Sequence, residues 1–405
     1  MSDSATPLVV YDDVVARQFA PFSLTRPLAA MRAGAELIER RWSAAFANAA
    51  SAFISSPHLD GFSEFDGPAA AHGVLAPGTI VANARCIVAL AARAHGGNVW
   101  RVGNDIAAVR LAKPLAAEAF RDGSLELASL APPGATAHTL PGRWVGVPWD
   151  LIGQLPDQVH EDAEVFAAQS AATAAPGGER FGSHPVVVEP GAHLEPFVVL
   201  DSTLGPIVIR ASAHLDAFTR VSGPCVIGAR THILGGRISG CAIGDDCRIH
   251  GDVSASIFVG HANKAHEGFV GHSVIGRWAN LGAGTTTSNL KNSYGAVKMW
   301  TPDGDRETGL TFLGSLIGDH AKLGIGAMLG TGTVVGAGAN VFGAMRPSKH
   351  VPPFAWGDAP PYETFSLEKF LQVADRVMQR RNAPMGAAMR EVLTRAHALG
   401  DTGEW

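Results

Sequence analysis

The sequence predicts two parts: a small α/β domain, then a left-handed parallel β-helix of hexapeptide repeats that ends in helices. The β-helix is indicated by an aliphatic residue at every sixth position of three runs that share one phase. Small residues also recur four places after these aliphatic residues. The first part lacks this period and alternates strand-like and helix-like segments. The three runs are Val188, Leu194 and Leu200; Ile209, Leu215, Val221, Ile227 and Ile233; and Ile317, Leu323, Leu329, Val335 and Val341.

A period of six residues fits neither an amphipathic helix nor a simple alternating strand. It fits a solenoid in which three hexads make one triangular coil, with coils stacked at the strand spacing of about 4.8 Å. In such a coil the aliphatic residue points inward, and the small residue lets the chain turn the corner. The 47 glycines and the low charged content of 17% suit these corners.

The elements of the first part follow from turn and helix signals. The segment LVVYDD predicts a short buried strand that ends in Asp12 and Asp13, and residues 24–42 predict a turn at Pro27 followed by a helix. Residues 79–93 and 99–115 are strand-rich. We expect this small α/β domain to occupy residues 1–165. A small-residue, Pro/Gly-rich linker is expected over 166–185.

The β-helix is expected over residues 186–345, with longer excursions that interrupt it between Val259 and Thr311. A proline-rich exit and C-terminal helices follow over 346–405. Ser366 is the predicted cap of the first helix, and the second extends to about Ala398. We expect these helices to cover the open end of the β-helix, which otherwise exposes strand edges.

Composition excludes several classes of function. The net charge of −5 offers no basic excess to bind a nucleic-acid backbone, so no nucleic-acid partner is expected. The N-terminal residues do not read as a signal peptide, and no apolar run is long enough to span a membrane. The four cysteines lack a CxxC spacing and are expected to be reduced core residues. These features predict a cytoplasmic protein without a membrane partner.

Two unusual stretches interrupt the repeat, HANKAHEGFVGH (261–272) and LGAGTTTSNLKNSYGAVKM (281–299). Together they resemble the acetyltransferase signature of the bifunctional enzyme that makes UDP-N-acetylglucosamine. A shorter bacterial family of sugar nucleotidyltransferases is more similar, both at LKN-x-YG-x-VK and at residues 24–42. The resemblance implies an acyl-CoA-dependent N-acetyltransferase that acts on an amino sugar phosphate, with acetyl-CoA as co-substrate.

The resemblance also assigns roles to residues of the second part. His266 falls on the catalytic histidine of the family, which takes a proton from the amine as it attacks the thioester. Asn289 matches the asparagine that contacts the sugar, and Lys264 the lysine of the histidine motif. Lys298 is a candidate for the substrate lysine, although it lies three places late. Phe269 replaces the substrate-binding tyrosine of the family.

Other departures concern the length and the far end of this region. The histidine motif lacks one glycine, and Arg346 lies near, but out of register with, the pyrophosphate-binding arginine of the family. The small-residue coils at 324–338 suit a pantetheine arm, but the coil corners require the same glycines.

For the first part, the resemblance implies a sugar-1-phosphate nucleotidyltransferase in nucleotide-sugar or cell-envelope precursor synthesis. Arg26 and Arg32 would bind UTP or dTTP at a helix N-terminus, and Asp12 or Asp13 would lie near Mg²⁺. However, no Gly-x-Gly precedes Arg26, and the domain is short. The alternatives to a nucleotide site are that both arginines lie on an exposed helix face, that the two acids are only solvated, and that the domain is vestigial.

Two other readings remain open. His261 and His266 have the H-x4-H spacing of a γ-type carbonic anhydrase, with His232 or His250 upstream as a third zinc ligand. A non-catalytic scaffold is the second. Every reading predicts a homotrimer, because side-by-side packing of β-helix faces buries their apolar outer surface.

Overall fold

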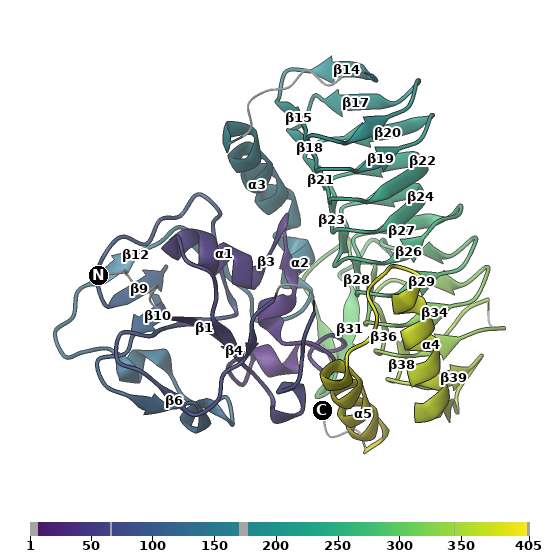
Figure 1. Ribbon diagram of the computed structural model, residues 1–405. Coiled ribbons are helices and arrows are strands. Elements are labelled where there is room, and N and C mark those ends of the chain that lie inside the picture. The colour runs from purple at the N-terminus through teal and green to yellow at the C-terminus, as the bar shows by residue number, and fades with distance from the viewer. Residues whose placement is uncertain (1–6, 65–66, 170–176, 344, 403–405) are drawn as a thin grey trace. The chain divides into compact units, whose positions relative to one another are not determined.

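The computed structural model describes residues 7–64, 67–169, 177–343 and 345–402 (Figure 1). Contacts divide the chain into two compact units. The first comprises Met1–Phe19, Ser23–Pro148 and Gly386–Ala396, and the second Ala20–Phe22, Trp149–Met385 and His397–Trp405. The fold class is the predicted one: an α/β region, a left-handed parallel β-helix and C-terminal helices.

The first unit is built on a seven-stranded mixed sheet. Its strand order is β12-β9-β10-β7-β1-β4-β5, and β1 is parallel to both of its neighbours. Because parallel neighbours share an edge, the carboxyl ends of β1, β4, β5 and β7 lie side by side. The strands are β1 (Leu8–Tyr11), β4 (Ala52–Ile54), β5 (Ala69–Ala70), β7 (Ile80–Asn83), β9 (Val99–Val102), β10 (Asp105–Arg110) and β12 (Ala137–Thr139).

The segment at residues 24–42 differs from the single helix predicted there. It forms the 3-10 turn η2 (Leu28–Ala30), a hairpin of β2 (Arg32–Ala33) and β3 (Glu36–Leu37), and only then α1 (Ile38–Phe46). Gly34 has φ +59°, a conformation that glycine adopts without strain and that ends a helical pattern. The helix therefore begins after the hairpin, where Ile38 and Trp42 are fully buried.

Short elements complete the first unit. Tyr11 packs edge-on against Phe120, with ring centroids 4.9 Å apart, in a core on one side of the sheet. The elements are η1 (Ala16–Gln18), η3 (Pro57–Leu59), β6 (Val74–Leu75), β8 (Cys86–Val88), β11 (Leu115–Ala116), η4 (Ala117–Phe120), η5 (Leu127–Leu130) and β13 (Gly142–Trp144).

The second unit is the β-helix, whose three faces are parallel sheets. The first face is β15 (Val186–Val188), β18 (Ile207–Ile209), β21 (Cys225–Ile227), β23 (Ala242–Ile243), β25 (Ile257–Phe258), β28 (Val274–Ile275), β33 (Ser315–Ile317), β36 (Thr333–Val335) and β38 (His350–Val351). The second contains β16 (His193–Leu194), β19 (His214–Leu215), β26 (Asn263–Lys264), β29 (Asn280–Leu281), β34 (Lys322–Leu323), β37 (Asn340–Val341) and β39 (Ala355–Gly357).

The third face is built from β14 (Glu179–Gly182), β17 (Val199–Ser202), β20 (Thr219–Ser222) and β27 (Phe269–Gly271), then β30 (Thr286–Thr287) and β35 (Met328–Leu329). Two long strands, β22 (His232–Ser239) and β24 (Arg248–Ser254), bend from the second face into the third. Strands are paired in register, so Leu215 lies over Ile233 and Ile233 over Ile249. The hexad residues all point into one core, as the sequence predicted.

The predicted break between Val259 and Thr311 was wrong in its first half. Coils continue through β30, and only residues 288–314 leave the repeat, carrying the hairpin of β31 (Lys298–Thr301) and β32 (Gly304–Glu307). The coil persists at HANKAHEGF because the interior position is filled by Lys264, which pairs in register with Ile249 and has no exposed surface. A lysine in that position hides the repeat from a search for aliphatic residues.

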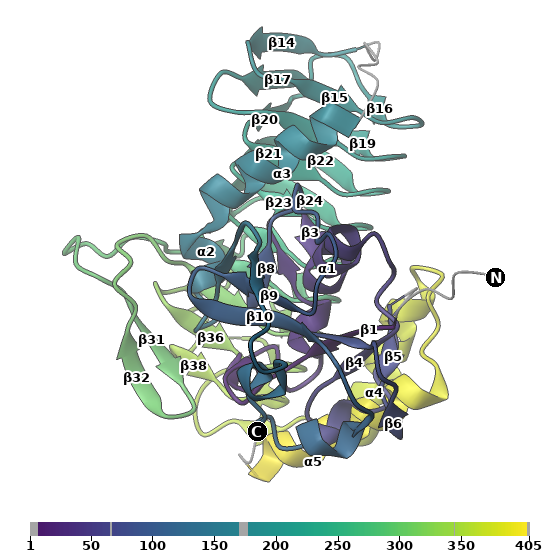
Figure 2. The ribbon, with the colours of Figure 1, turned by 90° about the vertical axis from the view of Figure 1, so that its left-hand side faces the viewer.

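Helices flank the β-helix at both ends. After α2 (Asp150–Gly153), α3 (Leu155–Gln169) packs against β15, β18 and β21 (Figure 2). At the other end β40 (Glu363–Thr364) pairs antiparallel with β39, and Phe370 of α4 (Leu367–Gln379) packs on Phe354. Ser366 holds the predicted cap position of α4 without a side-chain cap hydrogen bond. The last helix is α5 (Ala387–Thr402).

All four cysteines are buried and free of disulfides, as predicted. None of the helices in the described part of the chain combines the length and the apolar character that crossing a membrane requires.

Candidate functional site

A cavity of about 700 Å³ opens on the third face of the β-helix, at the coils where the repeat is interrupted. Strand β30 supplies Thr286 and Thr287, β27 supplies Phe269, and β35 supplies Met328 and Leu329. The in-register pair Thr286↔Met328 places their side chains on adjacent coils. The remaining lining residues are Ser288, Asn289, Gly330, Thr333, Arg346, Pro347 and Lys349.

Asn289 links this cavity to a histidine that the sequence analysis did not select. Its Nδ2 donates a hydrogen bond to Nδ1 of His272 across 2.8 Å. The His272 ring also stacks on Phe312, with centroids 5.3 Å apart, and burial lowers the pKa of His272 below its ordinary value. The imidazole is therefore held in one orientation and favours its neutral form, with its hydrogen on Nε2. Because Nδ1 accepts the Asn289 hydrogen bond, the ring can take a proton only at Nδ1 and only by giving up that bond.

Cationic side chains gather beside the cavity. Arg346 and Lys349 line it, and Lys349 Nζ donates to the carbonyl oxygen of Lys298 across 2.9 Å. Burial lowers the pKa of Lys349. The nearby positive charges of Lys291 and Lys298 lower it further, whereas the negative charge of Asp305 raises it. A lining of this charge favours an anionic ligand such as a phosphate ester.

The structure brings only some of the predicted residues together. Phe269 and Asn289 line the cavity, together with the out-of-register Arg346. Lys298 lies on the β31–β32 hairpin, where its Nζ is 3.2 Å from Oε1 of Glu307, and is not among the described lining residues. His266 is exposed in the turn between β26 and β27, and it does not line the cavity either.

Lys264 is buried beneath that turn rather than presented to a ligand. Its Nζ donates to the carbonyl oxygens of His250, His266 and Glu267. Burial lowers the pKa of Lys264 to about 8. The lysine thus ties the His266 turn to the interior of the coil, which is a positioning role.

The histidines of the carbonic anhydrase reading do not converge. His261 is buried against Trp278, with ring centroids 4.3 Å apart, and its Nδ1 lies 3.4 Å from a guanidinium nitrogen of Arg277. Among the described residues, the groups whose ligand atoms lie close enough to share a metal contain neither His261 nor His250 nor His266.

In the first unit, Asp12 directly follows β1 at the carboxyl edge of the sheet. Its Oδ2 accepts hydrogen bonds from Ser55 Oγ at 2.6 Å and from the Leu28 amide at 2.9 Å, while Oδ1 is buried without a partner among the described residues. Burial raises the pKa of Asp12 to about 6, against the effect of these hydrogen bonds. A buried carboxylate oxygen without a donor is an available ligand for a cation.

Asp13 is held differently. Oδ2 accepts from Arg85 at 2.7 Å and from Asn83 at 2.8 Å, and Oδ1 accepts from the Ala16 amide at 2.9 Å. Burial by itself would raise the pKa of Asp13, but Arg85 and Asn83 together hold it below its usual value. The carboxyl ends of β1, β4 and β7 therefore gather Asp12, Asp13, Ser55, Asn83 and Arg85.

Arg26 and Arg32 are both buried in protein contacts. Arg26 is 1% exposed and makes a two-point contact with Glu64, at 3.0 and 3.2 Å, while Arg32 NH1 donates to the carbonyl oxygen of Ala35. Nucleotide binding by Arg26 and Arg32 remains a prediction. It requires the ion pair between Arg26 and Glu64 to break.

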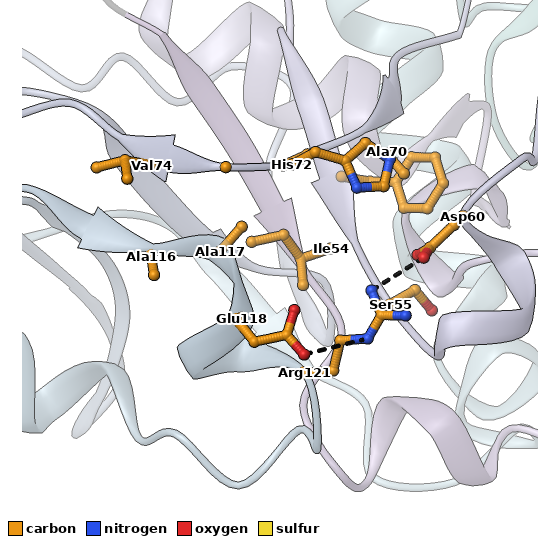
Figure 3. A pocket seen from close by; sticks show the side chains of 13 residues that line it. Ile54, Ser55, Asp60, Ala70, His72, Val74, Ala116, Ala117, Glu118 and Arg121 are labelled. Carbon is orange, nitrogen blue, oxygen red and sulfur yellow. Dashed lines mark hydrogen bonds and ion pairs between the residues drawn. The ribbon is translucent and has the colours of Figure 1, made fainter.

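A second cavity, of about 290 Å³, lies at the same edge of the sheet (Figure 3). Ser55 lines it, so the cavity adjoins the hydrogen-bond partner of Asp12. Arg121 stands between Asp60, at 2.9 Å, and Glu118, at 3.7 Å, in this view. In open parallel sheets, ligands bind in the crevice outside the carboxyl ends of the strands.

Comparison with known proteins points first to a class of enzyme. Residues 8–171, less than half of the chain, match the family model described as sugar nucleotidyl transferase, so this part of the chain is similar to that family. The match extends from β1 through α3.

The relatives are more specific. The chain is 30% identical over 118 residues to "Bifunctional protein GlmU" of Rippkaea orientalis (strain PCC 8801 / RF-1). The aligned residues cover 26% of this chain and 25% of that protein. It is 29% identical over 135 residues to "Bifunctional protein GlmU" of Acaryochloris marina (strain MBIC 11017), and these residues cover 30% of this chain and 28% of that protein. The chain thus spans about a quarter of the length of each relative. As predicted, it resembles a sugar nucleotidyltransferase family related to GlmU.

Proposed function

We propose that this chain is a transferase with two sites. The cavity on the β-helix would transfer an acetyl group from acetyl-CoA to the amine of an amino sugar phosphate. The carboxyl edge of the first sheet would bind UTP or dTTP with a sugar-1-phosphate. The observation that carries the proposal is the β-helix cavity, because it joins Asn289 and Phe269, at matched motif positions, with the cations Arg346 and Lys349.

In the proposed acetyl transfer, the amine nitrogen attacks the thioester carbonyl while a base takes its proton. Coenzyme A leaves as the thiolate. Arg346 and Lys349 would bind the phosphate of the acceptor, Asn289 would contact the sugar, and backbone amides of the coil would stabilise the oxyanion. His266 is the base by motif position.

His272 is a second candidate for that base. Its hydrogen bond to Asn289 connects it to a residue that lines the cavity, whereas His266 stands on an exposed turn. Because His266 does not line the cavity, its assignment requires the turn between β26 and β27 to move the imidazole toward it. Both assignments are carried into the tests below.

For the first site, we propose that Asp12 holds Mg²⁺ and that Asp13 supports it. Asp12 fits a cation because its Oδ1 has no hydrogen-bond partner in the part of the chain that the structure describes, whereas Arg85 and Asn83 already bind Asp13. When bound, Mg²⁺ supplies charge neutralisation at the phosphates. Arg26 and Arg32 remain the proposed phosphate ligands, with Arg121 at the adjoining cavity as an additional donor.

The proposal extends to the setting of the protein. We propose a cytoplasmic homotrimer with functional borders at residues 165 and 186, acting in nucleotide-sugar or cell-envelope precursor synthesis. The four free cysteines support a reducing compartment. The resemblance to GlmU supports small-molecule substrates.

One experiment separates the two activities. Pure protein is mixed with UTP or dTTP, a panel of sugar-1-phosphates and amino sugar phosphates, acetyl-CoA and Mg²⁺, and the products are separated. Release of both pyrophosphate and free coenzyme A supports both sites. Coenzyme A without pyrophosphate restricts activity to the β-helix. If neither pyrophosphate nor coenzyme A is released, the proposal is contradicted and a non-catalytic scaffold is favoured.

A further inference from the structure

Three histidines form a ladder on the outer side of the second face of the β-helix. His193 pairs in register with His214, and His214 with His232, so the same outward position carries an imidazole on three successive coils. Neighbouring rings lie 4.7 Å apart, centroid to centroid, in both steps. The spacing is fixed by the hydrogen-bonded strands beneath, so the imidazoles are presented as a rigid array.

Carboxylates lie beside this ladder on the first two of its coils, two positions after the histidine. Asp216 Oδ1 is 3.2 Å from Nε2 of His214 and 2.5 Å from Nε2 of His232. Glu195 Oε1 is 3.6 Å from the same His214 nitrogen. Within each of two overlapping sets, His193–Glu195–His214 and His214–Asp216–His232, the ligand atoms lie within 4.8 Å of one another.

We propose that His214, Asp216 and His232 form a binding site for a divalent transition metal of the zinc type. Two Nε2 atoms and one carboxylate oxygen converge, and tetrahedral zinc with bonds of about 2.0–2.1 Å to such ligands requires donor separations near 3.3 Å. The distance of 3.2 Å from Asp216 to His214 already matches this separation, whereas the 2.5 Å from Asp216 to His232 is shorter and needs a side-chain rotation to widen it. Imidazole with carboxylate favours zinc and its neighbours over magnesium or calcium.

The site is independent of the two proposed transferase sites. It shares no residue with either cavity, and of the histidines in the carbonic anhydrase reading it uses His232 alone, without His261, His266 or His250. The side chains of His214, Asp216 and His232 are 39%, 29% and 30% exposed, so an ion reaches them from solvent. Because its ligands come from two adjacent coils, a bound ion would clamp those coils together and raise thermal stability.

The alternative is a proton-only ladder, in which each imidazole carries its hydrogen on Nε2 and both donate to Asp216. That arrangement needs no metal and gives the same contacts. The two arrangements differ in their response to zinc, because only the first one binds the ion.

The test uses full-length protein stripped with EDTA, dialysed, and titrated with ZnCl₂ at pH 7.5, with bound zinc measured by equilibrium dialysis and mass spectrometry. The expected result is saturable binding of zinc with a rise in the unfolding temperature. The double variant Asp216→Asn/His232→Gln should bind zinc at least about tenfold more weakly and lose the thermal shift. Its metal-free unfolding curve shows whether it is folded.

Two single variants refine the assignment. His193→Gln should leave zinc affinity within about twofold of wild type, and His138→Gln, an exposed histidine of the first unit, serves as the matched control with no effect. Equal zinc affinity of wild type and the folded double variant would overturn the site. A loss caused by His193→Gln instead of the double variant would also overturn it, because the neighbouring set would then hold the ion.

Discussion

The β-helix and the first unit bury their residues by different rules. In the β-helix, each coil packs only on its neighbours, so one sequence position repeats as one place in the core: Leu215, Ile233 and Ile249 stack in register. In the first unit, the carboxyl edge gathers Asp12, Ser55 and Asn83 from segments far apart in the chain. A short-range rule can be read along the sequence, whereas the edge of a mixed sheet depends on strand order.

The same contrast applies to ionisable groups. Both units bury one at a place that shapes a candidate site: Lys264 inside the coil and Asp12 at the sheet edge. Lys264 is satisfied by three backbone carbonyls, but Asp12 keeps one oxygen without a partner. Incomplete satisfaction of a buried acid is more typical of a functional site than of a structural one.

The largest expected effect separates the two histidines at the β-helix cavity. If His272 is the base, His272→Ala should lower the acetyl-transfer rate by roughly 10²–10⁴-fold and His266→Ala by far less; the reverse ranking assigns His266. The measurement is release of free coenzyme A under saturating acetyl-CoA. Asn289→Ala should raise the acceptor KM more than it lowers kcat, if it only binds. Full activity of both histidine variants would remove this base mechanism.

The next effect tests the repeat itself. Ile249→Ala should lower the free energy of unfolding by about 2–5 kcal/mol, because a fully buried hexad side chain leaves a cavity in a close-packed core. The matched control is Ile325→Ala, at an outward position that is 82% exposed, with an expected change within about 0.5 kcal/mol. Urea unfolding measures both. Similar losses for the two variants would contradict the inward and outward assignment.

Asp12 should impose a pH dependence on the first unit. Its pKa is about 6 in the fold and about 3.9 in an unfolded chain, so the folded state binds the proton more tightly. Stability is then lost as pH rises from about 4 to about 6, by up to about 3 kcal/mol. Asp12→Asn lacks this loss, so its stability relative to wild type should increase over that range.

The control for this prediction is Asp13→Asn. Asp13 has a lowered pKa and pairs with Arg85, so removing its charge should destabilise the protein at neutral pH. This change in stability is opposite in sign to the one expected for Asp12→Asn. Chemical unfolding at pH 4 and pH 7.5 compares the three proteins. Parallel pH profiles for wild type and Asp12→Asn would show that Asp12 is not the buried acid described here.

The last effect, no larger than that of Asp12, concerns Lys264. Its pKa is about 8 in the fold and about 10.4 in an unfolded chain, so the folded state binds fewer protons between these values. Wild-type stability should therefore rise from pH 8 to pH 10, by up to about 3 kcal/mol. Lys264→Met, of similar length, should lack this rise and loosen the turn that carries His266. Unfolding midpoints at the two pH values measure the first effect, and an unchanged slope in the variant would contradict it.

The sequence by itself determined the fold class and the core of the β-helix. A hexad repeat specifies direction, spacing and burial locally, because no distant segment is needed to decide which side chain points inward. It failed at Lys264, where a lysine takes an aliphatic position, and at residues 24–42, where Gly34 turns a hairpin before the helix begins. Phe269 and Asn289, which the family resemblance selected as substrate-binding residues, both line a cavity, but their role stays a prediction.

Only the tertiary structure decided which groups meet. The contact of His272 with Asn289 and the approach of Lys349 to Lys298 join segments from different coils and from the excursion at 288–314. Likewise, the convergence of Asp12 with Ser55, and of Asp13 with Asn83 and Arg85, follows from the order of β4, β1 and β7 in the sheet. The physical reason is that a motif constrains neighbours in sequence, whereas hydrogen bonds and charge pairs form between neighbours in space, which strand order and coil stacking select.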